Sequence, residues 1–367
     1  MLARLYATNY RCLVNFEFKP TAKQLIIGRN DTGKTTVFDV LSMVRDVAVR
    51  AKPLEDCLGS KTWTYWQEAT EQRFELDVTG NGGEYRYTLI VDEGGSPPRL
   101  FVKLERLDFE GKPLFRFFEG KASLFNDKQM PTPNYEIPLD GQRAALHLSV
   151  ADPRYNKKSS WFFLWLARLD QAQINPWAMS ARSERESLYP SKDMSNFADW
   201  DRHLRLESGD AVFEAIKDLR EAIPGFEALD AKEAGLDVRV LQATIRRPNG
   251  KPVEVPLSDL SEGRRTLIAL YVLLHCAVGD DRTLLIDEPD NFIALAEIQP
   301  WLMKLLDRVD ETGGQVILVS HHPELLDQLA CQGGVLLDRP NGGETRVRPF
   351  APPGDTGLKP SEIIARG

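Results

Sequence analysis

A glycine-bounded segment between an apolar run and a helical pattern constrains this chain more than any other feature. Residues 28–35 read GRNDTGKT, which fits the pattern G-x-x-x-x-G-K-[ST]. The apolar run at residues 25–27 precedes this segment, and apolar residues at helical spacing follow it over residues 37–48. The order strand, glycine loop and helix predicts a loop that binds phosphate groups, rather than an ordinary glycine turn.

The residue types of this loop suit phosphate chemistry. Gly28 and Gly33 let the backbone come close to phosphate oxygens, and free N–H groups at the helix start attract an anion. We expect Lys34 to neutralise the β- and γ-phosphates and the Thr35 hydroxyl to ligate Mg²⁺. The other loop residues assigned to the nucleotide-binding set are Arg29, Asn30, Asp31, Thr32 and Thr36.

A second apolar strand pattern, at residues 283–286, ends in the two carboxylates Asp287 and Glu288. Open α/β sheets bind their ligands beyond the carboxyl ends of their strands. We therefore expect Asp287 to join the magnesium shell and Glu288 to polarise the attacking water as a general base. The alternative is a solvated acidic loop, because Asp290 follows soon after.

Two more segments place polar residues at the ends of apolar elements. Ser261 and Gly263 stand where an apolar helix pattern begins, so the serine either caps that helix or contributes to a second anion site. His321 follows an apolar strand pattern at residues 315–319. It is placed either to donate a hydrogen bond to a γ-phosphate or simply to begin the next helix.

Composition limits the classes of partner and setting. The net charge of -8, from 46 Lys+Arg and 54 Asp+Glu, argues against coating nucleic acid through overall charge, although local basic patches stay open. The 4 cysteines show no C-x-x-C spacing, so we expect a reducing, cytoplasmic setting without disulfides or zinc. The longest nearly apolar run, residues 267–278, is shorter than the roughly 20 residues that cross a bilayer, so we expect no membrane role.

Taken in order, these elements resemble the ABC-type ATPases, specifically the soluble RecF-like, SMC-like and OLD-like branch. The closest likeness is to its compact AAA-family ATPases without a coiled coil or Toprim domain. The motifs that carry the resemblance are Asn9-Tyr10-Arg11 as N-[FY]-R, residues 260–263 as the signature, Asp287-Glu288-Pro289 as Walker B and His321 as the switch histidine. The resemblance covers residues 1–70 and 236–340.

The resemblance implies an α/β P-loop NTPase of ABC-ATPase topology, with an antiparallel β lobe and an inserted helical arm. Strand patterns over residues 73–125 and helical stretches over residues 159–233 agree with it. In the last third, predicted helices that begin near residues 263 and 300 alternate with the strands at residues 283–286 and 315–319. A hairpin through Leu337 and Val347 follows them. The predicted domains are 1–70, the N-terminal ATPase part; 71–150, the β lobe; 151–235, the helical arm; and 236–367, the C-terminal ATPase part.

The resemblance further implies an ATP hydrolase whose heads dimerise face to face around two ATP molecules. Ser261 and Gly263 of one subunit would complete the site built on Lys34 of the other. Gln72 would be the glutamine that senses Mg²⁺ and water, and Arg11 would approach the phosphates. In the D-loop, Ala294 stands where an acidic residue or histidine is common, so hydrolysis is expected to be slow or to need a partner.

Two functions stay open at this point, and a GTPase is a weaker third because no N-K-x-D guanine-reading motif occurs. The first is an ATP-gated clamp on duplex DNA in repair or genome defence. Its candidate phosphate contacts, which alternatively form a solvated face, are Arg143, Arg154, Lys157, Lys158, Arg182 and Arg185. The second is a switch that holds or activates a separately encoded effector, as in anti-phage or toxin-linked systems. Its docking stripe, which alternatively belongs to the core, is Trp161, Phe162, Trp165 and Leu169.

Overall fold

The computed structural model describes residues 1–59, 62–150, 154–248, 250–351 and 357–366. The chain divides into two compact units. Unit 1 consists of Met1–Thr21, Ile26–Leu169 and Val335–Phe350. Unit 2 consists of Ala22–Leu25, Asp170–Gly334 and Ala351–Gly367. The first residues of the predicted arm, 151–153, lie outside the described residues.

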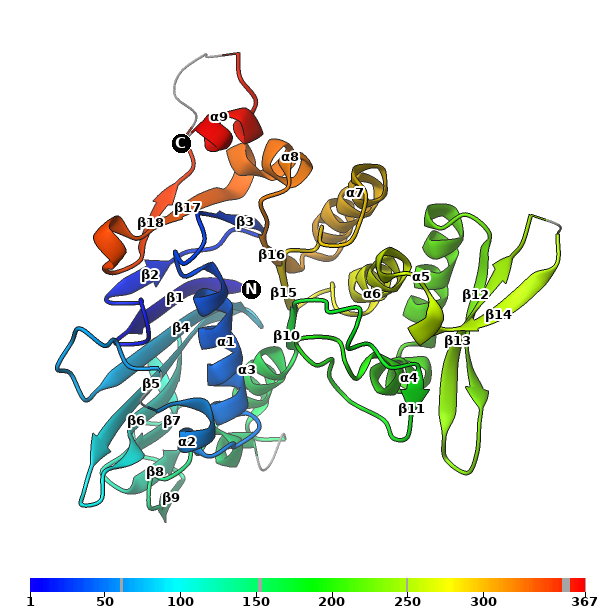
Figure 1. The fold of residues 1–367 in the computed structure, drawn as a ribbon. Helices are drawn as coiled ribbons and strands as arrows, with labels where there is room; N and C mark the ends of the chain where they lie inside the picture. The colour runs from blue at the N-terminus through cyan, green and yellow to red at the C-terminus, as the bar shows by residue number, and fades with distance from the viewer. Residues whose placement is uncertain (60–61, 151–153, 249, 352–356, 367) are drawn as a thin grey trace. The chain divides into compact units, whose positions relative to one another are not determined.

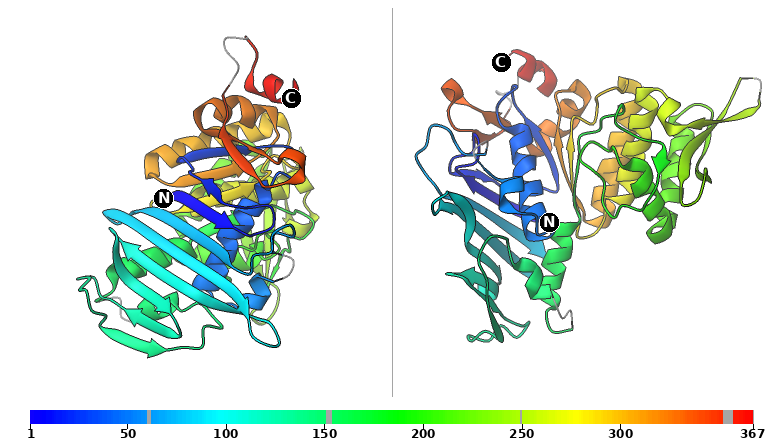
Figure 2. Two further views of the ribbon diagram at one scale, coloured as in Figure 1. Left: turned by 90° about the vertical axis from the view of Figure 1, so that its left-hand side faces the viewer. Right: turned by 60° about the horizontal axis from the view of Figure 1, so that its bottom comes forward.

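An 8-stranded antiparallel sheet dominates unit 1, in the order β2-β1-β4-β5-β6-β7-β8-β9. Figures 1 and 2 show helix α1 beside the long strands of this sheet. The elements of unit 1 are β1 (Leu2–Thr8), β2 (Phe16–Phe18), α1 (Lys34–Ala48), α2 (Leu54–Cys57), β4 (Gln72–Gly80), β5 (Gly83–Gly94), β6 (Arg99–Phe109), β7 (Lys112–Phe118), β8 (Lys121–Leu124), β9 (Tyr135–Pro138), the 3₁₀ helix η1 (Leu146–Val150), α3 (Lys157–Ala167), β17 (Gly334–Asp338), the 3₁₀ helix η3 (Pro340–Gly342) and β18 (Arg346–Pro349).

Alternation along the strands gives this sheet one apolar face. On β4, the side chains of Phe74 and Leu76 are fully buried, and β1 aligns Leu5 with Leu76 in the antiparallel register. Helix α3 packs aromatic rings against this face, with the ring of Phe162 at 5.7 Å from that of Tyr87. The strands expected between residues 73 and 125 are therefore confirmed.

The aromatic stripe proposed as a docking surface belongs to the core instead. Phe162, Trp165 and Leu169 are at most 1% exposed, and the ring of Trp161 stacks on Tyr85 at 5.0 Å. Helix α3 ends at Ala167, so Leu169 lies on the short strand β10 (Leu169–Ala172) and not on the helix. Helical spacing alone did not show that the strands of the sheet already cover these rings.

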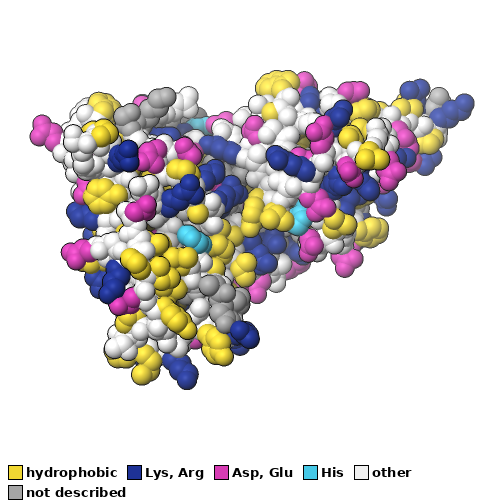
Figure 3. All heavy atoms as spheres, turned by 90° about the horizontal axis from the view of Figure 1, so that it is seen from below, with side chains coloured by type: hydrophobic (Ala, Val, Ile, Leu, Met, Phe, Trp, Pro, Cys, Tyr) yellow, Lys and Arg dark blue, Asp and Glu magenta, His cyan; other side chains and the backbone are white. Residues whose placement is uncertain are grey.

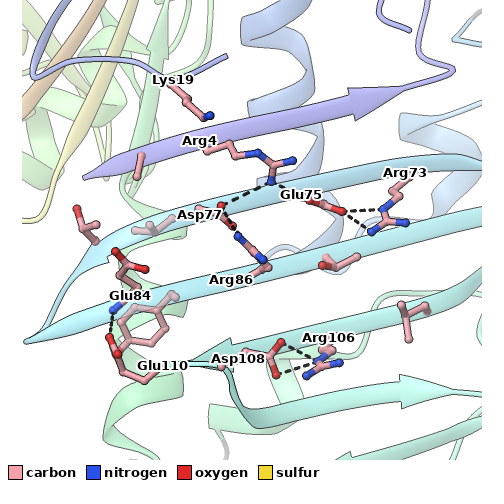
Figure 4. Close-up of a pocket in the computed structure, with 17 residues that line it drawn as sticks. Arg4, Lys19, Arg73, Glu75, Asp77, Glu84, Arg86, Arg106, Asp108 and Glu110 are labelled. Carbon is pink, nitrogen blue, oxygen red and sulfur yellow. Dashed lines mark hydrogen bonds and ion pairs between the residues drawn. The ribbon is translucent and has the colours of Figure 1, made fainter. Parts of the chain in front are cut away.

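The opposite face of the sheet carries charged side chains around a hollow of about 810 Å³ (Figure 4). Arg4 pairs with Glu75 at 2.8 Å, and Arg86 pairs with Asp77 at 2.7 Å. Basic and acidic side chains line the hollow in equal number. Because these charges neutralise one another, the hollow offers no concentrated site for an anion or a cation.

Glu105 is a fully buried carboxylate in unit 1. Its Oε2 accepts a hydrogen bond from the backbone N–H of Ala145 at 2.6 Å, and its Oε1 accepts one from the Tyr87 hydroxyl at 2.7 Å. Burial raises the pKa of Glu105 to about 7, although these hydrogen bonds favour the ionised form. The side chain thus ties the segment before η1 to the middle of β6.

Unit 2 contains the parallel strands β15 and β16, helices and a second antiparallel sheet. Leu285 aligns with Ile317 and Asp287 with Val319 in the parallel register. The elements of unit 2 are β11 (Arg182–Ser183), α4 (Phe197–Glu207), α5 (Gly209–Ala222), β12 (Phe226–Glu233), β13 (Arg239–Arg246), β14 (Pro252–Pro256), the 3₁₀ helix η2 (Leu257–Asp259), α6 (Glu262–Cys276), β15 (Thr283–Asp287), α7 (Leu295–Thr312), β16 (Gln315–Val319), α8 (Pro323–Gly333) and α9 (Pro360–Arg366).

Strand β3 (Lys23–Ile27) begins in unit 2 and ends in unit 1. The 6-stranded sheet to which it belongs has the order β10-β15-β16-β3-β17-β18. The predicted closing hairpin is confirmed, because Leu337 of β17 pairs with Val347 of β18. Across the described ranges, no helix has the length and apolar character that crossing a bilayer requires.

Helix α7 begins at Leu295 and not near Pro300 as predicted. The Glu297 carboxylate accepts a hydrogen bond from the backbone N–H of Ala294 at 3.1 Å, which fixes the helix start. Pro300 lies inside the helix. The prediction gave the proline its usual place in the first turn and overlooked the glutamate that sets the boundary.

Candidate functional site

The loop between β3 and α1 is held by its own carbonyl groups. Lys34 Nζ donates hydrogen bonds to Gly28 O at 2.7 Å and to Arg29 O at 2.9 Å, and Thr32 Oγ1 donates to Arg29 O at 2.8 Å. Gly33 is the N-cap of α1, with φ of 95°, and no side chain caps this helix start. The helix therefore presents N–H groups without a side-chain cap, as an anion site requires.

Close packing around the loop accounts for both of its glycines. A Cβ on Gly28 would lie 2.5 Å from Leu337 O, and a Cβ on Gly33 would lie 2.7 Å from Thr345 Oγ1. Real Cβ atoms essentially never come within 3.0 Å of such neighbours. The β17–β18 hairpin thus encloses the loop so closely that only glycine fits at these positions.

Arg339 anchors the tip of the loop and was not predicted from the sequence. Its Nη1 donates hydrogen bonds to Asp31 O at 3.0 Å and to Asp31 Oδ2 at 2.9 Å. The same guanidinium lies 5.9 Å from the centre of the Trp66 ring, which is 37% exposed. No motif marks Arg339, and it lies 308 positions from Asp31 in the chain.

Gln72 is fully buried at the start of β4. Its Nε2 donates hydrogen bonds to Asn9 O at 2.7 Å and to Thr62 O at 3.2 Å. Its Oε1 has no hydrogen-bond partner within the part of the chain that the structure describes. A buried amide oxygen without a hydrogen-bond partner lowers the stability of the folded state by roughly 1–3 kcal/mol. A ligand that binds this oxygen would remove that cost.

Arg11, predicted to approach the phosphates, contacts the phosphate-loop helix in this structure. Its Nη1 donates a hydrogen bond to Asp39 Oδ2 on α1 at 2.6 Å, and its guanidinium lies 5.4 Å from the centre of the Tyr10 ring. The side chain is 42% exposed. It therefore lies next to α1, with a carboxylate as its ionic partner.

Asp287 and Glu288 occupy the end of β15 in unit 2. Asp287 is 3% exposed, whereas the Glu288 side chain is 36% exposed. The Glu288 backbone N–H donates a hydrogen bond to Val319 O at 2.8 Å, and its Oε2 accepts one from Asn291 Nδ2 at 2.9 Å. One carboxylate is thus enclosed at the sheet edge, and the next reaches solvent.

His321 lies beside Glu288, with 4.0 Å between His321 Nε2 and Glu288 Oε1. The neighbouring His322, and not His321, caps helix α8, because its Nδ1 accepts a hydrogen bond from the backbone N–H of Glu324 at 3.2 Å. The role of beginning the helix therefore belongs to His322. Unit 2 brings together the predicted general base and the predicted switch histidine.

Ser261 stands at the N-cap position of α6, yet its side chain caps no backbone N–H. Its side chain is exposed, so the hydroxyl is accessible to a ligand. Two residues later, a Cβ on Gly263 would lie 2.8 Å from Phe292 O. The structure therefore does not support the simple capping role for Ser261, and it places Gly263 against the turn after β15.

The oxygen groups predicted to bind the metal are, taken one by one, of the kind that Mg²⁺ prefers. They are the orphaned Gln72 Oε1, the Thr35 hydroxyl and the buried Asp287 carboxylate. Mg²⁺ prefers hard oxygen ligands and is usually held by one or two carboxylates together with substrate phosphates and water. Each predicted group matches that preference, with Gln72 and Thr35 in unit 1 and Asp287 in unit 2.

The six basic residues predicted to contact DNA do not form one surface within either unit. Arg143, Arg154, Lys157 and Lys158 belong to unit 1, whereas Arg182 and Arg185 belong to unit 2. Lys158 Nζ donates a hydrogen bond to Gln129 Oε1 at 2.9 Å, and Arg182 pairs with Glu184 at 2.8 Å. Internal partners therefore occupy part of this set.

A different basic group lies at the tip of the β13–β14 hairpin, where Figure 3 shows Lys and Arg side chains gathered at the far right. Its residues Arg246, Arg247 and Lys251 are exposed. Arg246 pairs with Glu227 on β12. The sequence contains the pair Arg246-Arg247 and Lys251, but only the pairing of β13 with β14 brings them to one tip.

Comparison with known proteins places these motifs in a family. Residues 25–327 match the family described as "AAA domain, putative AbiEii toxin, Type IV TA system". The chain belongs to this AAA-domain family. The match spans both units of the structure and contains every predicted site residue except Arg11.

Curated relatives of this AAA domain match a short stretch of the chain. The DNA double-strand break repair Rad50 ATPase of Methanosarcina mazei is 35% identical over 96 residues, which is 23% of this chain and 9% of the relative. The ABC transporter ATP-binding protein ARB1 of Saccharomyces cerevisiae is 35% identical over 81 residues, which is 22% of this chain and 12% of the relative. The chain thus spans about a tenth of the length of these relatives.

Among solved structures, the AAA domain is similar to an SMC head bound to the C-terminal winged-helix domain of ScpA. The TM-score is 0.57 at 12% sequence identity, and the match covers 95% of this chain and 98% of the other. At this identity the similarity concerns the fold alone. It confirms the predicted α/β P-loop fold of ABC-ATPase topology. The family match and the partial match to a Rad50 ATPase agree with the predicted resemblance to the RecF and SMC branch.

Proposed function

We propose that this chain is a Mg²⁺-dependent ATPase that hydrolyses ATP to ADP and phosphate. The observation that carries the proposal is the pair formed by Glu288 and His321, 4.0 Å apart beyond adjacent parallel strands. A half-exposed carboxylate can take a proton from water, and an imidazole can hydrogen-bond to a phosphate oxygen. The buried Asp287 immediately before Glu288 supplies the metal-binding carboxylate that such a reaction requires.

In the proposed reaction, Lys34 leaves the loop carbonyl groups and neutralises the β- and γ-phosphates of ATP. The uncapped start of α1 binds the same phosphates through backbone N–H groups. Thr35, Asp287 and Gln72 would hold Mg²⁺, which would supply positive charge to stabilise the phosphate oxygens. Glu288 orients the attacking water and accepts its proton, while His321 hydrogen-bonds to the γ-phosphate.

The proposal extends to a dimer in which two chains enclose two ATP molecules. Ser261 carries an accessible hydroxyl at the start of α6, and this hydroxyl caps no backbone N–H group of its own helix. Such a helix start is suited to binding a phosphate group of an ATP molecule that a second copy of the chain holds. Ser261 and Gly263 would therefore complete the site that contains Lys34 of the other chain.

We propose that ATP-driven dimerisation gates binding to duplex DNA in repair or genome defence. One curated relative is a DNA double-strand break repair ATPase, which supports this reading. The exposed basic tip of the β13–β14 hairpin supplies cationic side chains for the phosphate backbone. Arg247 and Lys251 at this tip are therefore candidates for DNA contact beside the six basic residues predicted from the sequence.

A second candidate is a nucleotide-dependent switch that holds or activates a separately encoded effector. The description of the matching family, which names a toxin of a Type IV TA system, favours this candidate. The contacts of Lys158 with Gln129 and of Arg182 with Glu184 favour it as well, because these two basic side chains are then less available to DNA. In this reading, ATP occupancy changes the affinity for the partner and hydrolysis resets it.

The steady-state ATPase rate tests both candidates when it is measured with and without linear duplex DNA at two salt concentrations. The Glu288→Gln variant provides the blank. Stimulation by DNA that fades with added salt supports the DNA clamp, since phosphate contacts release counterions. In that case Arg247→Ala with Lys251→Ala should weaken the stimulation. An ATPase rate that does not change when DNA is added favours the effector switch. A wild type that hydrolyses ATP no faster than the blank contradicts the proposed ATPase activity.

A further inference from the structure

The turn after β15 contains two residues with unusual backbone geometry. Glu288 and Phe292 have φ values of 50° and 70°, in the left-handed region that L side chains rarely adopt. Such conformations persist where the surrounding structure holds them, and they often occur at functional sites. Because Glu288 is the proposed general base, whatever holds this turn also sets the position of its carboxylate.

Two contacts within unit 2 hold the turn from the side of α6. Gly263 comes so close that a Cβ there would lie 2.8 Å from Phe292 O. The Phe292 ring meets the ring of Trp177 edge to face, with 4.7 Å between their centres and 86° between their planes. The first contact limits movement of the backbone toward α6, and the second holds the Phe292 side chain.

Trp177 is itself tied to α6 through the preceding residue. The carbonyl of Pro176 accepts a hydrogen bond from Arg265 Nη1 at 2.5 Å, and Arg265 on α6 is only 7% exposed. The backbone N–H of Trp177 donates to Asn175 Oδ1 at 3.2 Å, which fixes the loop locally. At 66% exposure, Trp177 buries little area in the core, so its ring acts mainly on Phe292.

The turn passes this restraint to the carboxylate through Asn291. Asn291 precedes Phe292, and its Nδ2 donates the 2.9 Å hydrogen bond to Glu288 Oε2. Its backbone N–H also donates to Glu288 O at 3.2 Å. The restraint therefore reaches Glu288 by contiguous contacts, from Arg265 through Trp177 and Phe292 to Asn291.

We propose that Trp177 is a positioning residue, which fastens the turn after β15 to α6 and thereby orients the Glu288 carboxylate. The inference rests on the proposed ATPase function and deepens it, because it assigns a role to a segment outside the Walker and signature motifs. Trp177 acts through Phe292 and Asn291, without contact to substrate.

Steady-state kinetics of the full chain with MgATP test this role through Trp177→Ala. We expect kcat to fall roughly three- to tenfold while the KM for ATP stays unchanged, since a single ring contact is lost and the phosphate loop is untouched. Trp177→Phe, which keeps an aromatic ring, should recover most of the rate. Phe213→Ala, which removes an aromatic side chain of 59% exposure on α5, serves as the matched control and should behave as the wild type.

Several outcomes would overturn the proposal. An unchanged kcat in Trp177→Ala removes the positioning role, and a raised KM with normal kcat would assign Trp177 to nucleotide binding. In the Glu288→Gln background, loss of the ATP-dependent dimer by Trp177→Ala would assign it to the subunit interface. If Trp177→Ala does not fold, Phe292→Leu removes the same ring contact and must show the same fall in kcat. A wild type no faster than Glu288→Gln would instead contradict the proposed ATPase.

Discussion

His321 Nε2 lies 4.0 Å from Glu288 Oε1, and these residues follow the ends of the paired strands β16 and β15. Asp287, which precedes Glu288, aligns with Val319 in the parallel register. The register therefore sets the spacing between the carboxylate and the imidazole. Both side chains are partly exposed, so a substrate can reach them.

Replacing Glu288 with glutamine should abolish ATP turnover while ATP binding persists. The amide keeps the size of the side chain but cannot accept a proton from water, so we expect kcat to fall by about 100-fold or more. Phosphate release and nucleotide binding, measured on the same preparation, check this. Glu311→Gln, at an exposed position on α7, is the control. Equal turnover in Glu288→Gln and the wild type would remove Glu288 from the catalytic role.

Replacing Lys34 with alanine should weaken nucleotide binding, because the phosphates lose their principal cation. We expect the Kd for ATP, measured by calorimetry, to rise at least about tenfold, with the melting temperature of the free protein reported alongside. The control is Lys19→Ala, since the Lys19 side chain is 67% exposed and pairs with Glu17 outside the loop. An unchanged Kd in Lys34→Ala would contradict the phosphate-binding assignment.

Introducing arginine at Ser261 should block ATP-driven dimers and leave the monomer folded. The exposed serine tolerates a larger side chain in the monomer, but bulk and charge would exclude the second chain. Each serine variant is made in the Glu288→Gln background, and its sedimentation in the presence of ATP measures the dimer. The matched variant Ser258→Arg adds the same group three positions earlier, on η2, and should still dimerise. Dimers formed equally well by both variants would count against the enclosed-nucleotide arrangement.

Burial of Glu105 predicts a pH dependence of stability. Because the folded state raises its pKa from 4.5 to about 7, the folded state holds a proton that the unfolded state has released between these values. The free energy of unfolding should therefore fall as pH rises from about 4.5 to 7, by on the order of 3 kcal/mol from this group. Urea unfolding at several pH values measures the slope.

Glu105→Gln should flatten this slope, since the amide does not titrate. The control Glu119→Gln, at an exposed turn position, should keep it. A slope that survives Glu105→Gln unchanged would assign the pH dependence to other groups.

The sequence was most informative where a function depends on residues close together in the chain. The loop from Gly28 to Thr35 lies between an apolar run and a helical pattern, and the structure has β3 and α1 there. The strand that ends at Asp287 and the hairpin pairing of Leu337 with Val347 were likewise predicted from local patterns. Local predictions failed where one neighbour decided the outcome, as Glu297 does at the start of α7.

Relations between distant residues could not be predicted in this way. Arg339 reaches Asp31 across 308 positions, and Trp177, in a loop that no motif marks, meets Phe292 in the turn after β15. The spacing of the aromatic residues of α3 left both a core role and a docking surface open, and only the structure shows that the sheet covers them.

The sequence by itself therefore determined the fold class, and it predicted a phosphate-binding role for the loop before α1 and a metal-binding and catalytic role for the carboxylate pair, because periodicity and motif spacing are local properties. Only the tertiary structure decided how Glu288 is held, which histidine caps α8 and which basic residues are already paired. These arrangements depend on packing between segments that lie far apart in the chain. Composition and residue spacing do not indicate which of those segments come into contact.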